Sequence, residues 1–141
     1  MSVAKLMVAA ARTAPKARGE DSIKTAIVTD NDKGRLASAM EEMGTEYTRD
    51  AQNVRESGAV VLIGVVCGEA SDSWWPFKAK IIDLGIAVGS AVKLASELNV
   101  DNRVMHRVGE AAMKIELLRA DEVIGIPLSI KGKNIFFDRK T

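Results

Sequence analysis

The sequence is short of cysteine, histidine and aromatic residues, and each shortage excludes a class of site. Its 141 residues contain one cysteine, Cys67, and one histidine, His106. One cysteine excludes a disulfide within the chain and a cysteine-ligated zinc or iron–sulfur site built from a single chain. A Ser–His–Asp or Cys–His arrangement needs a base beside its nucleophile, and nothing near His106 identifies it as one. The sequence therefore gives no sign of side-chain catalysis.

Charge of one sign and long hydrophobic runs are also missing. Lysines and arginines are interspersed with acidic residues and the net charge is +1, so no basic face for nucleic acid is expected. Apolar runs such as AVVLIGVVC are far shorter than the roughly 20 residues that a membrane span needs. We expect a cytoplasmic protein, with one domain over residues 1–141 and no nucleic-acid or membrane partner.

Periodicity of apolar residues predicts the elements. Strands are expected at 24–29, 59–66, 121–129 and 134–139, the last two joined by IKGK as a hairpin. The run at 59–66 is apolar throughout and is typical of a strand buried on both faces. About five helices accompany them, which predicts an α+β fold and not a doubly wound parallel sheet.

Two helices have recognisable ends and faces. The N-terminal helix should bury one side, formed by Val3, Leu6, Met7 and Ala10. A helix from about residue 30 should be capped by Asp30 or Asp32 and end at Gly44.

The longest helical pattern begins near residues 73–75, because Pro76 is tolerated only in a first turn. Small residues crowd this helix, so we expect protein around nearly all of it and a close backbone neighbour at Gly85 and Gly89. That neighbour is either the chain's own core or a second subunit. A full list of the small residues is Gly85, Ala87, Gly89, Ser90, Ala91 and Ala95.

A cationic loop, ARTAPKARG, follows the N-terminal helix. Arg12, Lys16 and Arg18 lie close together beside Gly19, where irregular backbone and guanidinium groups suit a phosphate or another anion. Lys131 and Lys133 form a second basic turn. The alternative for both is an ordinary solvated basic loop.

Three blocks carry a resemblance to a known family: AARTAPKARG, IIDLGIAVGSAVKLASELNVDNR and VIGIPLSIKGKNIFFDR. Together they resemble the ferredoxin-domain-containing proteins, which in turn look like distant relatives of nitroreductase-like flavoproteins. The APKARG loop resembles the APS-x-x-N loop of those flavoproteins, DLGIAVGS their D-x-G-x-A helix and GIPLS their closing GYP strand. The resemblance implies a nitroreductase-like α+β fold around an antiparallel-type sheet of about four strands.

That resemblance also implies a homodimer with FMN at the subunit interface. Arg12, Lys16, Arg18 and Gly19 would then hold the flavin with Lys131 and Lys133, and Trp74 or Trp75 would cover its ring system. The expected function is electron transfer or reduction of a small organic substrate. The alternative is a non-enzymatic oligomeric subunit that keeps the fold without cofactor, since the arginine- and serine-containing opening segment of the flavoproteins is not found here.

The stretch GVVCGEASDSWWPF departs from the related proteins. Those carry a C-G-x-C-G pattern, whereas Cys67 and Gly68 are followed here by Ala70 in place of the second cysteine. No iron–sulfur cluster is therefore expected. Metal binding by Cys67 across a symmetric interface is the less favoured alternative. We interpret the stretch as a rebuilt hydrophobic corner, in which Trp74 and Trp75 pack or lie at a subunit interface.

Overall fold

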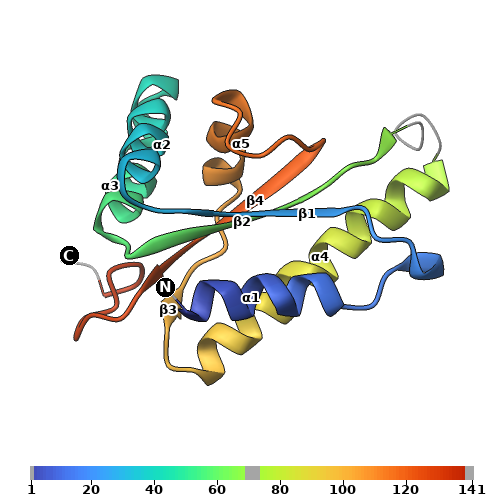
Figure 1. The fold of residues 1–141 in the computed structure, drawn as a ribbon. Helices are drawn as coiled ribbons and strands as arrows, with labels where there is room; N and C mark the ends of the chain where they lie inside the picture. Colours follow the sequence, from blue (N-terminus) through green and yellow to red (C-terminus); the bar gives the residue numbers. More distant parts are fainter. Residues whose placement is uncertain (1, 69–73, 139–141) are drawn as a thin grey trace.

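A four-stranded antiparallel sheet forms the centre of the structure, a computed structural model that describes residues 2–68 and 74–138 (Figure 1). Its strands are β1 (Ile23–Val28), β2 (Ala59–Val65), β3 (Asp101–Asn102) and β4 (Glu122–Ser129). They lie in the order β1-β2-β4-β3, and every neighbouring pair is antiparallel. The predicted α+β class with an antiparallel sheet is confirmed.

Five α-helices and two short 3₁₀ turns are found within the described residues. The helices are α1 (Ser2–Thr13), α2 (Asp30–Met43), α3 (Thr48–Glu56), α4 (Trp74–Glu97) and α5 (His106–Lys114), and the turns are η1 (Ala17–Gly19) and η2 (Thr45–Tyr47). Helix α4 begins where the position of Pro76 predicted. No helix in the described part of the chain is both long and apolar enough to cross a membrane.

The central strand β2 is buried along its whole length, as its uninterrupted apolar run predicted. Alternate residues of a strand point to opposite faces, so β2 serves two cores. Val61, Ile63 and Val65 face α1 and α4, whereas Val60 and Leu62 face α2, α3 and α5.

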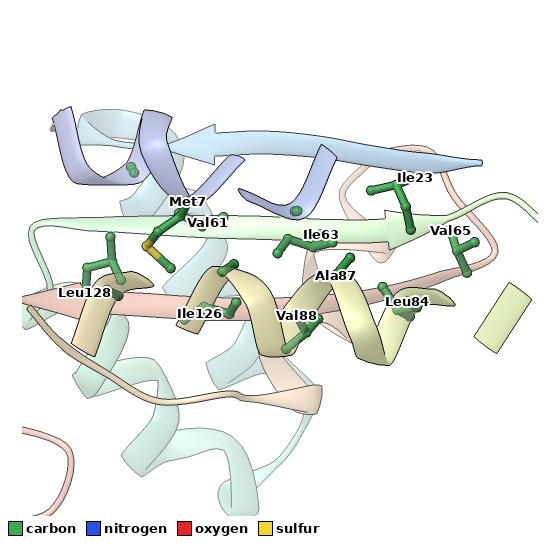
Figure 2. Close-up of a cluster of buried hydrophobic side chains, with 14 of the residues drawn as sticks. Met7, Ile23, Val61, Ile63, Val65, Leu84, Ala87, Val88, Ile126 and Leu128 are labelled. Atoms are coloured by element: carbon green, nitrogen blue, oxygen red, sulfur yellow. The ribbon is translucent and has the colours of Figure 1, made fainter. Parts of the chain in front are cut away.

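Helices therefore cover both faces of the sheet. Figure 2 shows Met7 of α1 and Leu84, Ala87 and Val88 of α4 directed at the strands. On the opposite face α5 lies on β4, and α2 and α3 pack beside it (Figure 1).

The predicted C-terminal hairpin is wrong. Strand β4 pairs with β2 and β3, and the described part of the 134–139 segment forms a turn. The side-chain oxygen of Asn134 accepts the N–H of Phe136 (3.0 Å), and Oδ2 of Asp138 accepts the N–H of Asn134 (2.9 Å). These local hydrogen bonds compete with strand pairing. Phe136 is nevertheless fully buried.

Two finer predictions about helices need correction. Met7 lies on the buried side of α1 as predicted and Val3 packs against the core, but Ala4 and Ala11 complete that side and Leu6 is half exposed. The cap position of α2 is taken by Thr29, whose side chain makes no capping hydrogen bond. The predicted end of α2 at Gly44 is confirmed.

Candidate functional site

The loop between α1 and β1 is fastened by the side chain of Arg12. Its Nη1 donates hydrogen bonds to Oδ2 of Asp21 (2.8 Å) and to the carbonyl oxygen of Ile23 (2.7 Å). The hydrogen bond from Arg12 lowers the pKa of the Asp21 carboxyl. Nζ of Lys16 donates to the carbonyl oxygens of Arg12 and Ala14. Both cations therefore stabilise the loop itself.

Arg18 lies within η1 in left-handed backbone, with φ 58° and ψ 14°, and Gly19 follows with φ 67°. An L-residue other than glycine rarely adopts this conformation, and such outliers are enriched at functional sites. The side chain of Arg18 makes no recorded ion pair within residues 2–68 and 74–138. Whereas Arg12 and Lys16 stabilise the loop, Arg18 is exposed and could bind a ligand.

A cleft of about 290 Å³ separates η1 from the first turns of α4. Its walls are Ala17, Arg18, Glu20, Trp75, Pro76, Ala79, Lys80 and Asp83. The fold thus brings together Arg18 and Trp75, two of the predicted cofactor residues that lie far apart in the sequence.

Two residues that the sequence interpretation missed hold the cleft in shape. Lys80 donates from Nζ to Oγ of Ser22 (2.6 Å) and forms an ion pair with Glu20 (3.4 Å). Asp83 is 3% exposed, and its Oδ1 accepts the backbone N–H of Ala17 (3.0 Å). Asp83 therefore ties α4 to η1. The sequence contained a signal for Asp83, because its position places a carboxylate on the same helical face as the buried alanines of α4.

The structure describes the side chain of Trp75 but not that of Trp74. Trp75 is 53% exposed at the cleft, so its ring is not packed into the core of the chain. Trp74 begins α4, but its side chain lies outside the described structure, as does Ala70.

Lys131 and Lys133 lie at the opposite end of the sheet from Arg18. Ile23 is aligned with Val65, and Val65 with Glu122, at the end nearest η1. The lysines follow Ser129 at the other end of β4, roughly 23 Å away at the usual strand rise. Figure 1 shows η1 and this C-terminal loop on opposite sides of the molecule. One chain therefore cannot bring both groups of cations to one phosphate.

Cys67 is 4% exposed, and its backbone N–H donates to Oδ2 of Asp121 (2.6 Å). Burial, followed by the charge of Asp121, raises the pKa of its thiol. No group of three potential metal-ligating side chains occurs among the residues that the structure describes. His106 begins α5 on the other face of the sheet from the cleft, with Nδ1 2.9 Å from Oε1 of Glu110 and Nε2 3.5 Å from Oε1 of Glu122.

The prediction that protein surrounds nearly all of α4 is not met within one chain. Ala87, Ala91 and Ala95 are buried, but Ile82 and Ile86 on the outer face are 46% and 41% exposed. A Cβ added at Gly85 or Gly89 would meet no atom within 4 Å. The outer face of α4, formed by Ile82, Gly85, Ile86 and Gly89, is therefore open and apolar.

Comparison with known sequences identifies relatives of the chain. Residues 77–139 match the family described as "Uncharacterized protein containing a ferredoxin domain (DUF2148)". An uncharacterized protein of Archaeoglobus fulgidus is 40% identical over 166 aligned positions, which cover 96% of this chain and 89% of that protein. Because this alignment is longer than the 141-residue chain, the relative carries residues that this chain does not have.

Solved structures share the fold at much lower identity. A Desulfovibrio desulfuricans protein assigned to the nitroreductases, in complex with FMN, has a TM-score of 0.71 at 14% identity, over 99% of this chain and 79% of that one. The NfrA1 nitroreductase from B. subtilis has a TM-score of 0.71 at 12% identity. That match covers 94% of this chain but 58% of NfrA1, so the chain spans less than two thirds of its length. The chain belongs to the family of ferredoxin-domain-containing proteins, and its fold is nitroreductase-like.

Proposed function

We propose that this protein is a flavin-binding, nitroreductase-like homodimer that transfers electrons or reduces a small organic substrate. The observation that carries the proposal is the cleft between η1 and α4, which Arg18 and Trp75 both line. This is the loop that the resemblance assigned to the flavin. A nitroreductase-like neighbour holds FMN, which supports the same cofactor here.

The residues of the cleft fit part of an FMN molecule. Arg18 supplies a cationic donor for an anionic group, Lys80 adds positive charge although it is paired with Glu20, and the half-exposed Trp75 supplies an apolar surface for an isoalloxazine ring. The cleft measures about 290 Å³, at the lower end of the roughly 300–1,000 Å³ typical of ligand pockets. One chain therefore offers part of the enclosure, and a second copy would supply the rest.

The outer face of α4 is suited to that second copy. Its exposed Ile82 and Ile86 flank Gly85 and Gly89, where another backbone could approach closely. A homodimer would also allow Lys131 and Lys133 of one chain to approach the Arg18 cleft of the other, which a single chain cannot do.

Mechanistically, this chain would bind and orient the cofactor. FMN supplies the hydride and single-electron chemistry when it is bound. Arg18 and Lys80 would offset negative charge on the ligand, and the hydrogen bond from Ala17 to Asp83 would keep η1 at a fixed distance from α4. Trp75 would shield the ring system from water. This arrangement requires no catalytic base from the chain.

An absorbance spectrum of the purified protein, followed by an FMN titration, tests the proposal. We expect a flavin spectrum or saturable FMN binding, and about a tenfold weaker affinity in Arg18→Ala because a charge-assisted hydrogen bond is lost. Arg35→Ala is the matched control, because Arg35 pairs with Asp32 on α2 and lies on the other face of the sheet. Colourless protein that ignores added FMN would overturn the proposal.

A non-enzymatic oligomeric subunit is the second candidate. It is favoured by the balanced charge of the cleft, where Glu20 and Asp83 oppose Arg18 and Lys80. A stable oligomer that binds no FMN, measured by light scattering and titration, would support this alternative.

A further inference from the structure

A second hollow lies on the other face of the sheet from the proposed flavin cleft. It measures about 340 Å³ and is formed where η2 and the first turn of α3 approach the start of α5. The residues that line it are Thr45, Glu46, Arg49, Asp50, Arg103 and Arg107. Three arginines line it with two acidic residues, so positive side chains outnumber negative ones in the hollow.

Two of these guanidinium groups are held in place by uncharged partners. Nη1 of Arg107 donates to the carbonyl oxygen of Glu46 (2.8 Å), and its guanidinium lies 5.5 Å from the centre of the Tyr47 ring. Nη1 of Arg103 donates to the carbonyl oxygen of Phe136 (3.4 Å), and its guanidinium lies 5.1 Å from the centre of the Phe137 ring. Carbonyl and ring contacts fix position without neutralising the charge.

The two acidic residues of the lining, Glu46 and Asp50, reduce the positive charge of the hollow but do not pair with its arginines. Within residues 2–68 and 74–138, no carboxylate lies within ion-pair distance of Arg49, Arg103 or Arg107. The carboxylate of Glu46 is folded back over Gly44, where it occupies the space that a Cβ would need. Elsewhere on the surface, Arg35, Arg55 and Arg119 are each paired with a carboxylate. In this hollow, by contrast, three arginines without a carboxylate partner among the described residues lie together.

We propose that this hollow binds a diphosphate group, as in inorganic pyrophosphate or the diphosphate of a nucleotide. Guanidinium groups bind phosphate oxygens through paired N–H donors, and a diphosphate offers three arginines two phosphate groups and more negative charge than a single phosphate does. Arg49 lies in the first turn of α3, beside Asp50, so the arginines reach the hollow from two separate segments of the chain. The site requires no flavin and is independent of the η1–α4 cleft.

Calorimetric titration of the full chain with inorganic pyrophosphate tests the proposal. We expect saturable binding that weakens as salt is raised, and at least about a tenfold loss of affinity in Arg103→Ala and Arg107→Ala. Arg107→Lys should retain only part of the affinity, because a lysine keeps the charge but not the paired donors. Arg119→Ala is the matched control and should bind normally, since Arg119 is 87% exposed and pairs with Glu116.

The variant Arg49→Ala distinguishes a loss of pyrophosphate binding from a loss of protein stability. Among the described residues the side chain of Arg49 has no hydrogen-bond, ion-pair or ring partner, so its removal should weaken pyrophosphate binding without shifting the thermal unfolding midpoint. Three results would overturn the proposal: no saturable binding, unchanged affinity in all three alanine variants of the hollow, or a loss that appears in Arg18→Ala instead. The last result would place pyrophosphate in the cleft proposed for flavin.

Discussion

Helices α5 and α4, on opposite faces of the sheet, use glycine in opposite ways. In the α2–α3–α5 layer, Gly109 of α5 lies directly against β4, and a Cβ there would be 1.8 Å from the carbonyl oxygen of Val123. In the α1–α4 layer, Gly85 and Gly89 of α4 face away from the sheet, with no atom within 4 Å of an added Cβ. One glycine permits a contact within the chain, and the others leave a surface open.

This difference shows that the sequence alone does not reveal what a helical glycine contacts. Gly109 explains how α5 packs so closely on β4, where Gly125 meets Val108 across the same interface. Gly85 and Gly89 have no such role in the chain, yet a glycine costs helix stability of about 1 kcal/mol relative to alanine. A contact with a second chain would account for them.

The largest effect is expected for Gly109→Ala. An added methyl group would collide with the backbone of Val123, and relief requires α5 to move away from β4. We expect the free energy of unfolding to fall by about 3 kcal/mol or more, measured by urea denaturation.

Gly34→Ala is the matched control for that variant. Gly34 also lies within a helix, α2, but an added Cβ would meet nothing within 4 Å. The control should therefore stabilise the chain by up to about 1 kcal/mol. Equal effects of the two variants would contradict the close contact between α5 and β4.

A smaller effect, on association and not on folding, is expected for Gly89→Leu. A Cβ at Gly89 meets nothing within one chain and leucine favours a helix more than glycine does, so the unfolding free energy of the monomer should not fall. If the outer face of α4 is the subunit interface, association measured by analytical ultracentrifugation should weaken about tenfold or more. Gly34→Leu should leave association unchanged. An unaltered dimer in Gly89→Leu would remove α4 from the interface.

The sequence predicted those elements whose signal is repeated along the chain. Strand β2 was recognisable in the sequence because its apolar run is uninterrupted, and all seven of its residues are buried. The start of α4 was recognisable because proline is restricted to the first turn of a helix. The end of α2 followed from Gly44, whose φ of 148° is unfavourable for other residues.

What could not be predicted depends on partners distant in sequence. The bounds of helix α5 are an example: it begins after Met105, which pairs with Gly125, and it ends before Glu116, whose φ is 58°. The two-residue strand β3 has no pattern of its own and exists because β4 is beside it. The same holds for the cleft, since the loop pattern that singled out Arg18 contains nothing that places it beside Trp75 or Lys80.

The smallest effect on stability is expected in the loop between α1 and β1, where Arg12 and Asp21 form a surface ion pair. Their side chains are 44% and 40% exposed, so solvent screens the pair. Asp21→Asn removes the charge but keeps an oxygen for the N–H of Ile23, and should cost about 1 kcal/mol or less at neutral pH. Arg12→Ala also loses the hydrogen bond to the carbonyl oxygen of Ile23.

The unfolding free energies of the two variants should differ in acid. The Arg12–Asp21 ion pair is lost when Asp21 is protonated, whereas the hydrogen bond from Arg12 to the carbonyl oxygen of Ile23 does not depend on that proton. The pKa of Asp21 is lower in the folded chain than its ordinary value of 3.8, so its contribution to stability is present above that value and is lost as pH falls through the folded pKa. The unfolding free energies of Asp21→Asn and the unaltered chain should therefore converge below about pH 3.8. The deficit of Arg12→Ala should persist there in part, because the contact with Ile23 is still missing. A deficit in Asp21→Asn that is constant from neutral pH into this acid range, followed by urea denaturation, would show that the charge of Asp21 does not stabilise the loop.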